Sequence, residues 1–401
     1  MLAHRIVFGG LMLGVFVGAN VYLYRRLVRD VTDHPWIRRA AAGAMALAFL
    51  SVPLIRFVFR GTLPPATATT VVLLWWGVII YTLMALVVAE AGRGLLSLRT
   101  GPKVSAEAAS GLPGNPSPQP TPENVSRRKF LARATAAGAL AVGGGFTAFG
   151  SYRAFAPPEV TEVPLVLPGL PKSLDGFTIV QLSDLHVGPV IRERFLDQLV
   201  ASANAAKPDL VAITGDLVDG KPDQLGRFVE RLRNLRSRHG TYFVSGNHDY
   251  YSGWEEWAAV LPGVGFTLLR NRFVTIGDAG GSFDLVGVED FGSRWGAGGY
   301  DLDAATAGRD PQRPSVLLAH QPNGLELAAQ KRVGLQLSGH THGGQMFPGT
   351  LVGEVIWGSR NAGLSKHRDT QLYTSRGCGF VGPPVRVGAP PEVVKVVLVA
   401  G

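Results

Sequence analysis

Long apolar stretches dominate residues 1–95. Residues 6–24, 40–55 and 66–89 contain no Asp, Glu, Lys or Arg, and the basic residues near them lie just outside. Each stretch can cross the ~30 Å hydrocarbon core of a membrane as a helix, the second one if the side chain of Arg56 reaches the interface. The helices of a soluble core rarely exclude polar residues so completely. The pattern therefore predicts transmembrane helices at about 6–24, 38–59 and 66–90. Since the three apolar stretches contain no acidic or basic residue, we expect these helices to act as an anchor and not as an ion or proton pathway.

A change in composition follows the apolar region. Residues 96–126 are rich in Pro, Ser, Gly and Ala, which predicts an exposed linker. Residues 127–156 begin with Arg127 and Arg128, followed by a weakly apolar Ala/Gly stretch. This pattern is typical of a twin-arginine export signal, and it equally fits a fourth transmembrane helix with flanking positive charge. Since Pro157 follows the small residues at which a signal would be cleaved, we expect the segment to be retained.

The distribution of positive charge predicts the topology. Five Lys and Arg residues lie between the first two apolar stretches and seven lie from Arg93 through Arg133, against three on the other side. The positive-inside rule places these basic segments in the cytoplasm. We therefore predict a multi-pass protein of the cytoplasmic membrane whose residues after about 152 lie on the extracytoplasmic side.

From residue 157 onward, short apolar runs that end in polar residues alternate with helical patterns. The runs 177–186, 209–216 and 241–249 are separated by predicted helices near 191–206 and 222–236. This alternation is typical of a sheet covered by helices. Six further predicted strands follow, with fewer helices between them: 272–278, 283–290, 315–320, 335–340, 371–375 and 392–399. We predict one α/β domain at 157–401, in which two packed sheets are flanked by helices.

Charge and cysteine content narrow the functional classes. The net charge of +9 comes from the N-terminal part: residues 1–156 contain 16 Lys and Arg against 5 Asp and Glu, and the remainder contains 23 against 25. The C-terminal domain lacks the basic stripe expected of a nucleic-acid-binding protein, so we expect no nucleic-acid partner. Cys378 is the single cysteine, which excludes an internal disulfide framework.

Five clusters of Asp, Asn and His stand where the apolar runs end. Together they hold five of the nine histidines: Asp184 and His186 in SDLH, Asp216 and Asp219 in GDLVD, Asn247 and His248 in GNHD, His320 in LAH, and His340 and His342 in GHTH. Open α/β sheets bind their ligands at the ends of strands, and residues spaced i, i+2 point the same way. Each cluster alone is a weak signal, but five in order predict a shared site.

Over residues 175–401 the chain resembles the calcineurin-like metallophosphoesterase superfamily. The motif order of that superfamily, DxH, GDxxD, GNH(D/E), H, GHxH, is present without a departure. GHTHGGQ and the segment 375–392 are most similar to the membrane-associated bacterial subgroup that includes the YkuE and YaeI phosphodiesterases. The resemblance implies a four-layer α/β/β/α sandwich, here preceded by an all-α region of three to four transmembrane helices, and a site for two metal ions.

The resemblance also implies a role for each candidate residue. Asp184, His186 and His342 would bind one ion, Asn247, His320 and His340 the other, and Asp216 would bridge the two. Imidazole ligands together with carboxylates favour two divalent ions such as Mn, Fe or Zn over Mg. A hydroxide between the metals would attack phosphorus, and His248, oriented by Asp219, would protonate the leaving group.

The expected reaction is hydrolysis of a phosphodiester or pyrophosphate bond. Attachment to the membrane favours a lipid-linked or other envelope substrate over a soluble small molecule. Arg294, in the predicted rim loop 288–296, is a candidate phosphate contact. Arg376 and Arg386 either do the same or hold the C-terminal strands in place. The alternatives are a phosphomonoesterase and a non-enzymatic metal-binding membrane scaffold. The twin-arginine interpretation adds the twin-arginine translocation machinery as a partner.

Overall fold

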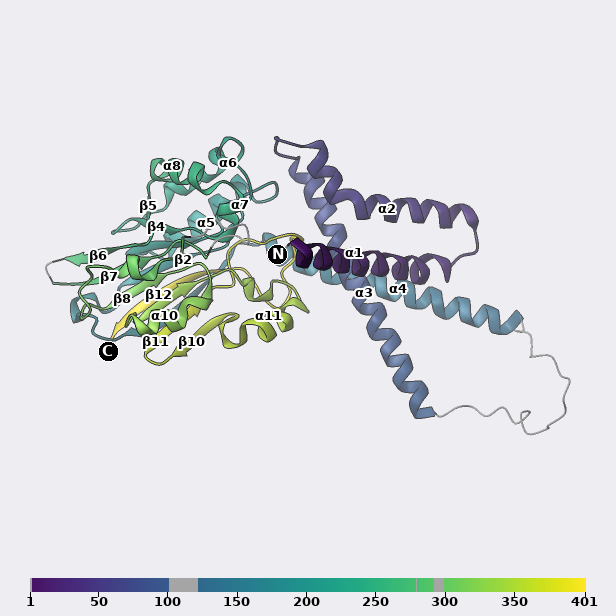
Figure 1. Ribbon diagram of the computed structural model, residues 1–401. Coiled ribbons are helices and arrows are strands. Elements are labelled where there is room, and N and C mark those ends of the chain that lie inside the picture. The colour runs from purple at the N-terminus through teal and green to yellow at the C-terminus, as the bar shows by residue number, and fades with distance from the viewer. Residues whose placement is uncertain (1, 101–121, 279, 292–298) are drawn as a thin grey trace. The chain divides into compact units, whose positions relative to one another are not determined.

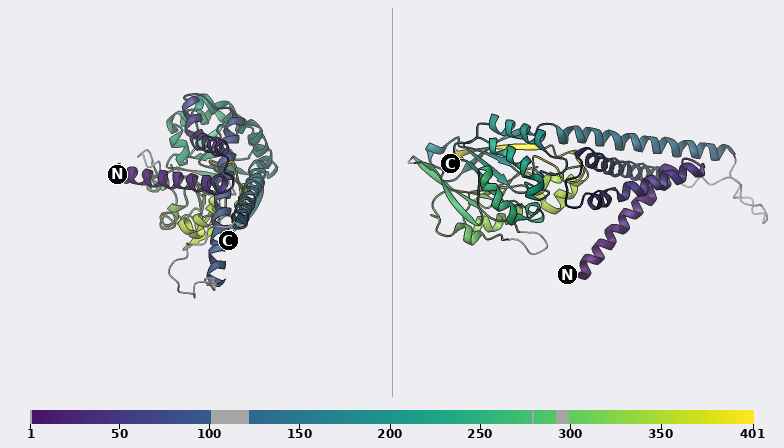
Figure 2. Two further views of the ribbon diagram at one scale, coloured as in Figure 1. Left: turned by 90° about the vertical axis from the view of Figure 1, so that its right-hand side faces the viewer. Right: turned by 90° about the horizontal axis from the view of Figure 1, so that it is seen from above.

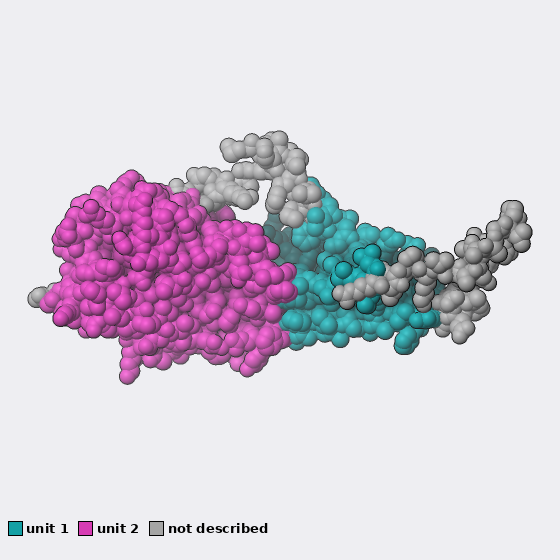
Figure 3. Space-filling view, turned by 90° about the horizontal axis from the view of Figure 1, so that it is seen from below, with its two compact units in different colours: residues 1–60, 71–148 teal, residues 61–70, 149–401 magenta. Residues whose placement is uncertain are grey.

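The computed structural model describes residues 2–100, 122–278, 280–291 and 299–401. The chain divides into two compact units (Figure 3). The first consists of residues 1–60 and 71–148, and the second of residues 61–70 and 149–401. The loop around residues 61–70 thus belongs to the same unit as the C-terminal domain.

Four long helices form most of the N-terminal region (Figure 1). They are α1 (Leu2–Tyr24), followed by the π-helical turn η1 (Arg25–Arg29), α2 (Pro35–Val58), α3 (Ala66–Thr100) and α4 (Pro122–Phe155). Among the described residues, two helical segments are long and apolar enough to cross a membrane: Pro35–Val58 and Ala66–Leu96. The first and the fourth predicted spans, at α1 and α4, stay predictions.

The helices differ in extent from the predicted segments. Helix α3 continues ten residues past the predicted end of its span at 90, and α4 begins five residues before the predicted start at 127. A helix need not stop where its apolar stretch stops, because residues 91–100 contain no proline and backbone hydrogen bonding continues through polar residues. Most of the predicted linker, residues 101–121, lies outside the described residues.

Polar contacts in the first unit join the basic segments. Lys129 forms an ion pair with Asp33, and Arg133 Nε donates to the carbonyl of Val31 at 3.1 Å. Arg93 donates to the hydroxyl of Thr135.

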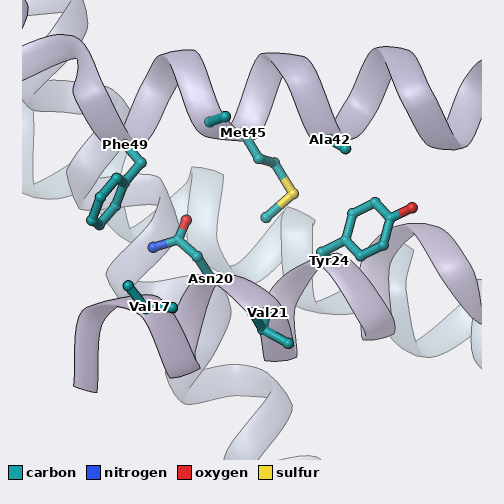
Figure 4. Close-up of a pocket in the computed structure, with 8 residues that line it drawn as sticks. Val17, Asn20, Val21, Tyr24, Ala42, Met45 and Phe49 are labelled. Carbon is teal, nitrogen blue, oxygen red and sulfur yellow. The ribbon is translucent and has the colours of Figure 1, made fainter. Parts of the chain in front are cut away.

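An apolar pocket between α1 and α2 (Figure 4) is lined by Val17, Asn20, Val21, Tyr24, Ala42, Met45, Ala46 and Phe49. Its lining residues include no cluster of metal-binding or nucleophilic side chains, so the pocket could accept an apolar group but does not form a catalytic site.

Two six-stranded mixed sheets form the C-terminal domain. The first has the order β1-β12-β2-β3-β4-β5 and the second β10-β11-β9-β8-β7-β6. The strands are β1 (Glu159–Leu167), β2 (Thr178–Leu182), β3 (Leu210–Thr214), β4 (Thr241–Val244), β5 (Phe266–Leu268), β6 (Arg272–Asp278), β7 (Gly281–Gly287), β8 (Ser315–Leu318), β9 (Leu335–Ser338), β10 (Gly363–His367), β11 (Thr370–Thr374) and β12 (Glu392–Ala400). Strands β2 to β5 run parallel, as do β7, β8, β9 and β11.

Three buried clusters of side chains establish the layers. One, which includes Ile179, Leu285 and Leu337, lies between the sheets. A second packs the outer face of the first sheet against helices, and a third does so for the second sheet (Figures 1 and 2). The helices are α5 (Glu193–Ala205), α6 (Pro222–Val229), α7 (Asn247–Tyr251), α8 (Trp254–Val264), α9 (Leu302–Thr306), α10 (Leu325–Gln330) and α11 (Gly349–Trp357). The predicted α/β fold with two packed sheets is confirmed.

Some of the observed strands and helices are not predicted by the pattern of apolar and polar residues. Strand β1 contains Pro164 and alternates polar with apolar residues; it lies at a sheet edge, where proline costs no hydrogen bond in the ladder, and pairs in parallel with β12. Strands β5 and β10 and helices α7 to α11 are short or irregular, so they lack the repeats from which longer elements are recognised.

Candidate metal centre

The candidate ligands follow immediately after parallel strands. Asp184 and His186 come after β2, Asp216 after β3 and Asn247 after β4 in the first sheet. His320 follows β8, and His340 and His342 follow β9 in the second sheet. Since carboxyl ends of parallel strands share one edge of a sheet, the loops of both sheets meet at one place.

One cluster consists of Asp184, His186 and His342. Nε2 of His342 lies 3.1 Å from Nε2 of His186 and 3.4 Å from Oδ1 of Asp184. All three residues are buried. Two imidazoles that face each other through Nε2 can share at most one hydrogen bond. A cation at this point would satisfy the two nitrogens and the carboxylate oxygen together.

A second cluster consists of Asp216, His320 and His340. Nε2 of His320 lies 3.2 Å from Oδ2 of Asp216 and 3.2 Å from Nδ1 of His340. Nδ1 of His320 is held by the backbone carbonyl of Thr214 at 2.8 Å, so Nε2 is directed into the cluster. A carbonyl on the far ring nitrogen of a histidine is the usual way in which proteins orient a metal ligand.

Asn247 lies between Gly246 and His248, whose backbones approach Asp216 of the second cluster. Among the described residues, no group donates a hydrogen bond to its buried Oδ1. An unsatisfied buried amide oxygen is costly, on the order of 1 to 3 kcal/mol. An ion that this oxygen could coordinate would remove that cost.

Asp216 connects the two clusters. Its Oδ1 accepts a hydrogen bond of 2.8 Å from the backbone N–H of His248. Its Oδ2 lies 3.2 Å from Nε2 of His320 and 3.8 Å from Nε2 of His186. One carboxylate oxygen therefore faces a ligand of each cluster.

The backbone at these positions is strained. Five of the seven candidate ligands are non-glycine residues with φ between 50° and 74°: Asp184, His186, Asp216, His340 and His342. In this left-handed region the Cβ of an L-residue crowds the backbone at a cost of about 1 to 2 kcal/mol per residue. Such strain concentrates at functional sites, where it turns side chains in a direction that regular strand geometry does not allow.

Two motif glycines are required by close approach. A Cβ at Gly246, which precedes Asn247, would lie 2.3 Å from Oδ1 of Asp216. A Cβ at Gly339, which precedes His340, would lie 2.2 Å from Oδ2 of Asp184. The glycines in GNH and GHTH thus allow the backbone of one motif to lie against the carboxylate of another.

The charged groups of the site shift one another's pKa, and the direction of the shift differs from residue to residue. Burial raises the pKa of Asp216, but His320 and His186 lower it overall, so this carboxylate stays ionised. Burial lowers the pKa of His186, but Asp219 and Asp216 outweigh it and raise the pKa to about 9. His340 has its pKa lowered to about 3 by burial and by the neighbouring His320. Its ring therefore remains neutral with a nitrogen lone pair to offer.

His248 and Asp219 lie next to this centre. Nδ1 of His248 is 2.6 Å from Oδ1 of Asp219, and the rings of His248 and His186 are 4.6 Å apart. Asp219 also contacts Nδ1 of His186 at 3.2 Å. The sequence predicts the contact with His248 only; the contact with His186 appears with the fold, because SDLH and GDLVD follow adjacent strands.

Two supporting residues show their backbone partners only in the structure. Arg386 is buried and donates to the carbonyls of Gly379 and His342, both at 3.0 Å. Asp249 accepts hydrogen bonds from the backbone of Leu217 and Gly246, which ties the GDLVD and GNHD loops together. These residues stand in the predicted motifs or beside them, but no local pattern signals a carboxylate or guanidinium that binds backbone.

Of the three arginines considered as phosphate contacts, two bind groups of the protein itself and one lies outside the described residues. Arg376 pairs with the carboxylate of Glu392, and Arg386 is enclosed by carbonyl groups, so both hold the C-terminal segment in place. Arg294 lies outside the described residues. Thr341, between the two GHTH histidines, is turned away and donates to the carbonyl of Asn361 at 2.5 Å.

The donor set fits divalent metal ions. Among the described residues, Asp184 with His186 and His342, and Asp216 with His320 and His340, each bring ligand atoms within 4.8 Å of one another. The partnerless Oδ1 of Asn247 adds a neutral oxygen. Nitrogen and oxygen ligands of this kind suit Mn, Fe or Zn.

Comparison with known proteins gives a consistent result. Residues 177–344 match the family described as Calcineurin-like phosphoesterase. An uncharacterized metallophosphoesterase of Helicobacter pylori is 38% identical over 271 residues, which cover 67% of this chain and 71% of that protein. A transmembrane protein with metallophosphoesterase domain from Danio rerio is 34% identical over 293 residues, 68% of this chain and 66% of its own. The uncharacterized metallophosphoesterase YkuE of Bacillus subtilis is 32% identical over 285 residues, 68% of this chain and 96% of its own.

The match spans all five motifs, and the residues that those motifs contribute meet at one edge of the two sheets. The chain therefore belongs to the calcineurin-like phosphoesterases and is a metal-dependent phosphoesterase.

Proposed function

We propose that this protein is a membrane-anchored phosphoesterase that uses two divalent ions to hydrolyse phosphodiester or pyrophosphate bonds. The observation that carries the proposal is the pair of buried clusters joined through Oδ2 of Asp216. One cluster alone would fit a single ion. Two clusters that share one carboxylate oxygen are what a two-metal hydrolase requires.

The proposed ligand sets follow the geometry. Asp184, His186 and His342 hold one ion, and Asn247, His320 and His340 hold the other. When bound, such ions supply an activated water and neutralise the charge of the phosphoryl oxygens. Mn, Fe and Zn are the proposed metals.

Asp216 is the proposed shared ligand. Its Oδ1 accepts a hydrogen bond from the backbone N–H of His248, and its Oδ2 faces His186 of one cluster and His320 of the other, so Asp216 would help to hold both ions.

His248 is the proposed general acid. The carboxylate of Asp219 accepts a hydrogen bond from Nδ1–H of His248, an arrangement that leaves Nε2 to face the substrate. A proton passes from Nε2 to the leaving oxygen as the bond to phosphorus breaks. Asp219 also accepts from Nδ1 of His186, so one carboxylate orients both the proton donor and a proposed metal ligand.

Two observations support anchoring with the catalytic domain outside the cytoplasm. Leu63, in the loop between α2 and α3, packs against the core of the domain, and the carbonyl of Pro64 accepts from Arg192 at 2.7 Å. At the end of α4, Ala154 is buried in the same core. Both points lie on the side predicted to be poor in positive charge, opposite the basic contacts of Lys129 and Arg133.

The same packing supports retention of the segment 127–156. Cleavage after Ala156 would remove Ala154 from the core and separate Phe155 from Phe380, whose ring lies 5.4 Å away. If the segment engages the twin-arginine translocation machinery, we expect it to serve as an uncleaved anchor.

The test uses the full-length protein purified in detergent. Elemental analysis is expected to find about two ions per chain, and the Mn-loaded protein should hydrolyse bis-(p-nitrophenyl) phosphate faster than p-nitrophenyl phosphate. A preference for the monoester would indicate a phosphomonoesterase. Turnover of neither compound, with metal present, would indicate a metal-binding scaffold. One ion or none would contradict the dinuclear proposal.

A further inference from the structure

Helix α11 exposes apolar side chains to an unusual degree. Leu351, Val352, Val355 and Ile356 are 51%, 53%, 87% and 66% exposed, and Gly353 is the residue of this helix that is buried. The four residues are spaced i, i+1, i+4 and i+5, which places them on one face of a helix. Contiguous apolar surface of this kind marks a site of interaction with protein or lipid.

The opposite side of α11 lines the candidate metal centre. Trp357, at the end of the helix, lies with its ring 5.6 Å from the ring of His340 in an edge-on arrangement. At the beginning of the helix, the backbone of Gly349 lies close to Gly344: a Cβ added at Gly344 would lie 2.3 Å from the carbonyl oxygen of Gly349. The helix is therefore a wall of the site, with its apolar face turned outward.

The segment 379–388 contacts both the last turns of α4 and the start of α11. Towards α4, the backbone N–H of Arg386 donates to the carbonyl of Gly150 at 2.9 Å. Towards α11, Val387 forms a β-bridge with Met346, and Gly388 approaches Thr350. Both contacts lie within the C-terminal unit. One short segment, 379–388, thus contacts both α11 and the end of α4 that packs on the domain.

We propose that the apolar face of α11 inserts into the interfacial layer of the bilayer in which the chain is anchored, and that the site acts on a phosphoester whose apolar part remains in that bilayer. This rests on the proposed function and on anchoring through α4. A substrate of this class presents its phosphate at the membrane surface, and α11 would hold the metal centre beside it.

The bilayer fits the face better than a second copy of the chain does. A nine-residue helix is about 14 Å long and about 10 Å wide, whereas a stable dimer buries about 800 Å² on each partner. An interfacial helix requires no such area, since the rest of the chain already tethers it. The exposed Glu354 lies off the apolar face, as the polar side of an interfacial helix does.

The test places a reporter on α11 in the full chain. Cys378 is fully buried, and burial raises the pKa of its thiol to about 12, so an introduced cysteine can be labelled selectively. Val355→Cys carries an environment-sensitive fluorophore, and Leu327→Cys on α10, 45% exposed, is the matched control. In liposomes the Val355 label is expected to shift to shorter wavelength and to be quenched by brominated lipid, while the control label stays in water. An aqueous signal from both, or crosslinking between copies at position 355, would overturn the proposal.

A second arm separates this inference from the proposed function. The double variant Val355→Glu with Ile356→Glu should lower turnover of a diacyl phosphodiester in vesicles about tenfold, because the charged face no longer enters the interface. Its turnover of bis-(p-nitrophenyl) phosphate should stay within about twofold of the parent, as should that of Leu327→Glu with both substrates. An equal loss on both substrates would overturn the proposal. Inactivity of the parent on the soluble diester would instead contradict the proposed function.

Discussion

At the scale of single residues, backbone strain concentrates where metal ions are proposed. The left-handed backbone at Asp184, His186 and Asp216 is unfavourable by itself, and the buried amide oxygen of Asn247 has no hydrogen-bond partner among the described residues. Ligand binding is the physical reason for which a fold keeps such features.

Removal of metal should therefore destabilise the protein. Treatment with EDTA is expected to lower the melting temperature by roughly 10 °C, because binding at about a thousand times Kd adds about 4 kcal/mol to a domain of this size. Differential scanning fluorimetry against a Mn²⁺ series checks this. A melting temperature that rises again with Mn²⁺ concentration supports the site. A melting temperature that changes neither with EDTA nor with Mn²⁺ would count against it.

Exchange of His248 tests the proposed proton donor. His248→Asn should lower kcat about 10²- to 10⁴-fold, most for poor leaving groups, with metal content unchanged. Asp219→Asn is the comparison, since Asp219 contacts both His248 and His186. That variant should lose activity and also bind metal about 10- to 100-fold more weakly. Loss of metal in His248→Asn would show that the role of this residue is misassigned.

At the scale of elements, the end of α4 is part of the catalytic domain. Gly150 packs so closely that a Cβ would lie 2.4 Å from Cγ1 of Val385, whereas a Cβ at Gly138 on the same helix meets nothing within 4 Å. These two glycines provide a matched pair for testing how firmly the helix is joined to the domain.

Gly150→Leu should destabilise the domain by about 1 to 3 kcal/mol, because the added side chain cannot fit against the segment 379–388. We expect a melting temperature lower by roughly 2 to 10 °C, while Gly138→Leu stays near the parent value. Equal melting temperatures for both variants would mean that the end of α4 does not pack on the domain as described.

At the scale of the whole molecule, anchoring of the domain to a membrane is a proposal that rests on two findings. Two described helices are long and apolar enough to span a membrane, and a relative from Danio rerio is named a transmembrane protein. The side on which the domain lies is a proposal that follows from charge.

Reporter fusions test that side. Alkaline phosphatase, which is active only outside the cytoplasm, should be active when fused after Gly401 and inactive when fused after Thr100, because the basic segments remain inside. A fusion of green fluorescent protein at the same points should give the reverse pattern. Activity at Thr100 with none at Gly401 would contradict the topology.

Local sequence patterns were enough to predict the class of fold, the succession of the main strands along the chain and the identity of the motif residues. These properties are local: a short, continuous apolar run shows a buried strand such as β3, and a cluster such as GNHD stands directly after the strand that carries it. The resemblance then named the family, which the comparisons confirmed.

How those residues meet depends on the packing of the two sheets. His186 and His342 are 156 positions apart, and their contact depends on two sheets packed face to face. The second contact of Asp219, the enclosure of Arg386 and the apolar face of α11 depend likewise on neighbours distant in the chain. Such neighbours leave no local pattern, because burial and partnership belong to the packed molecule and not to any segment of it.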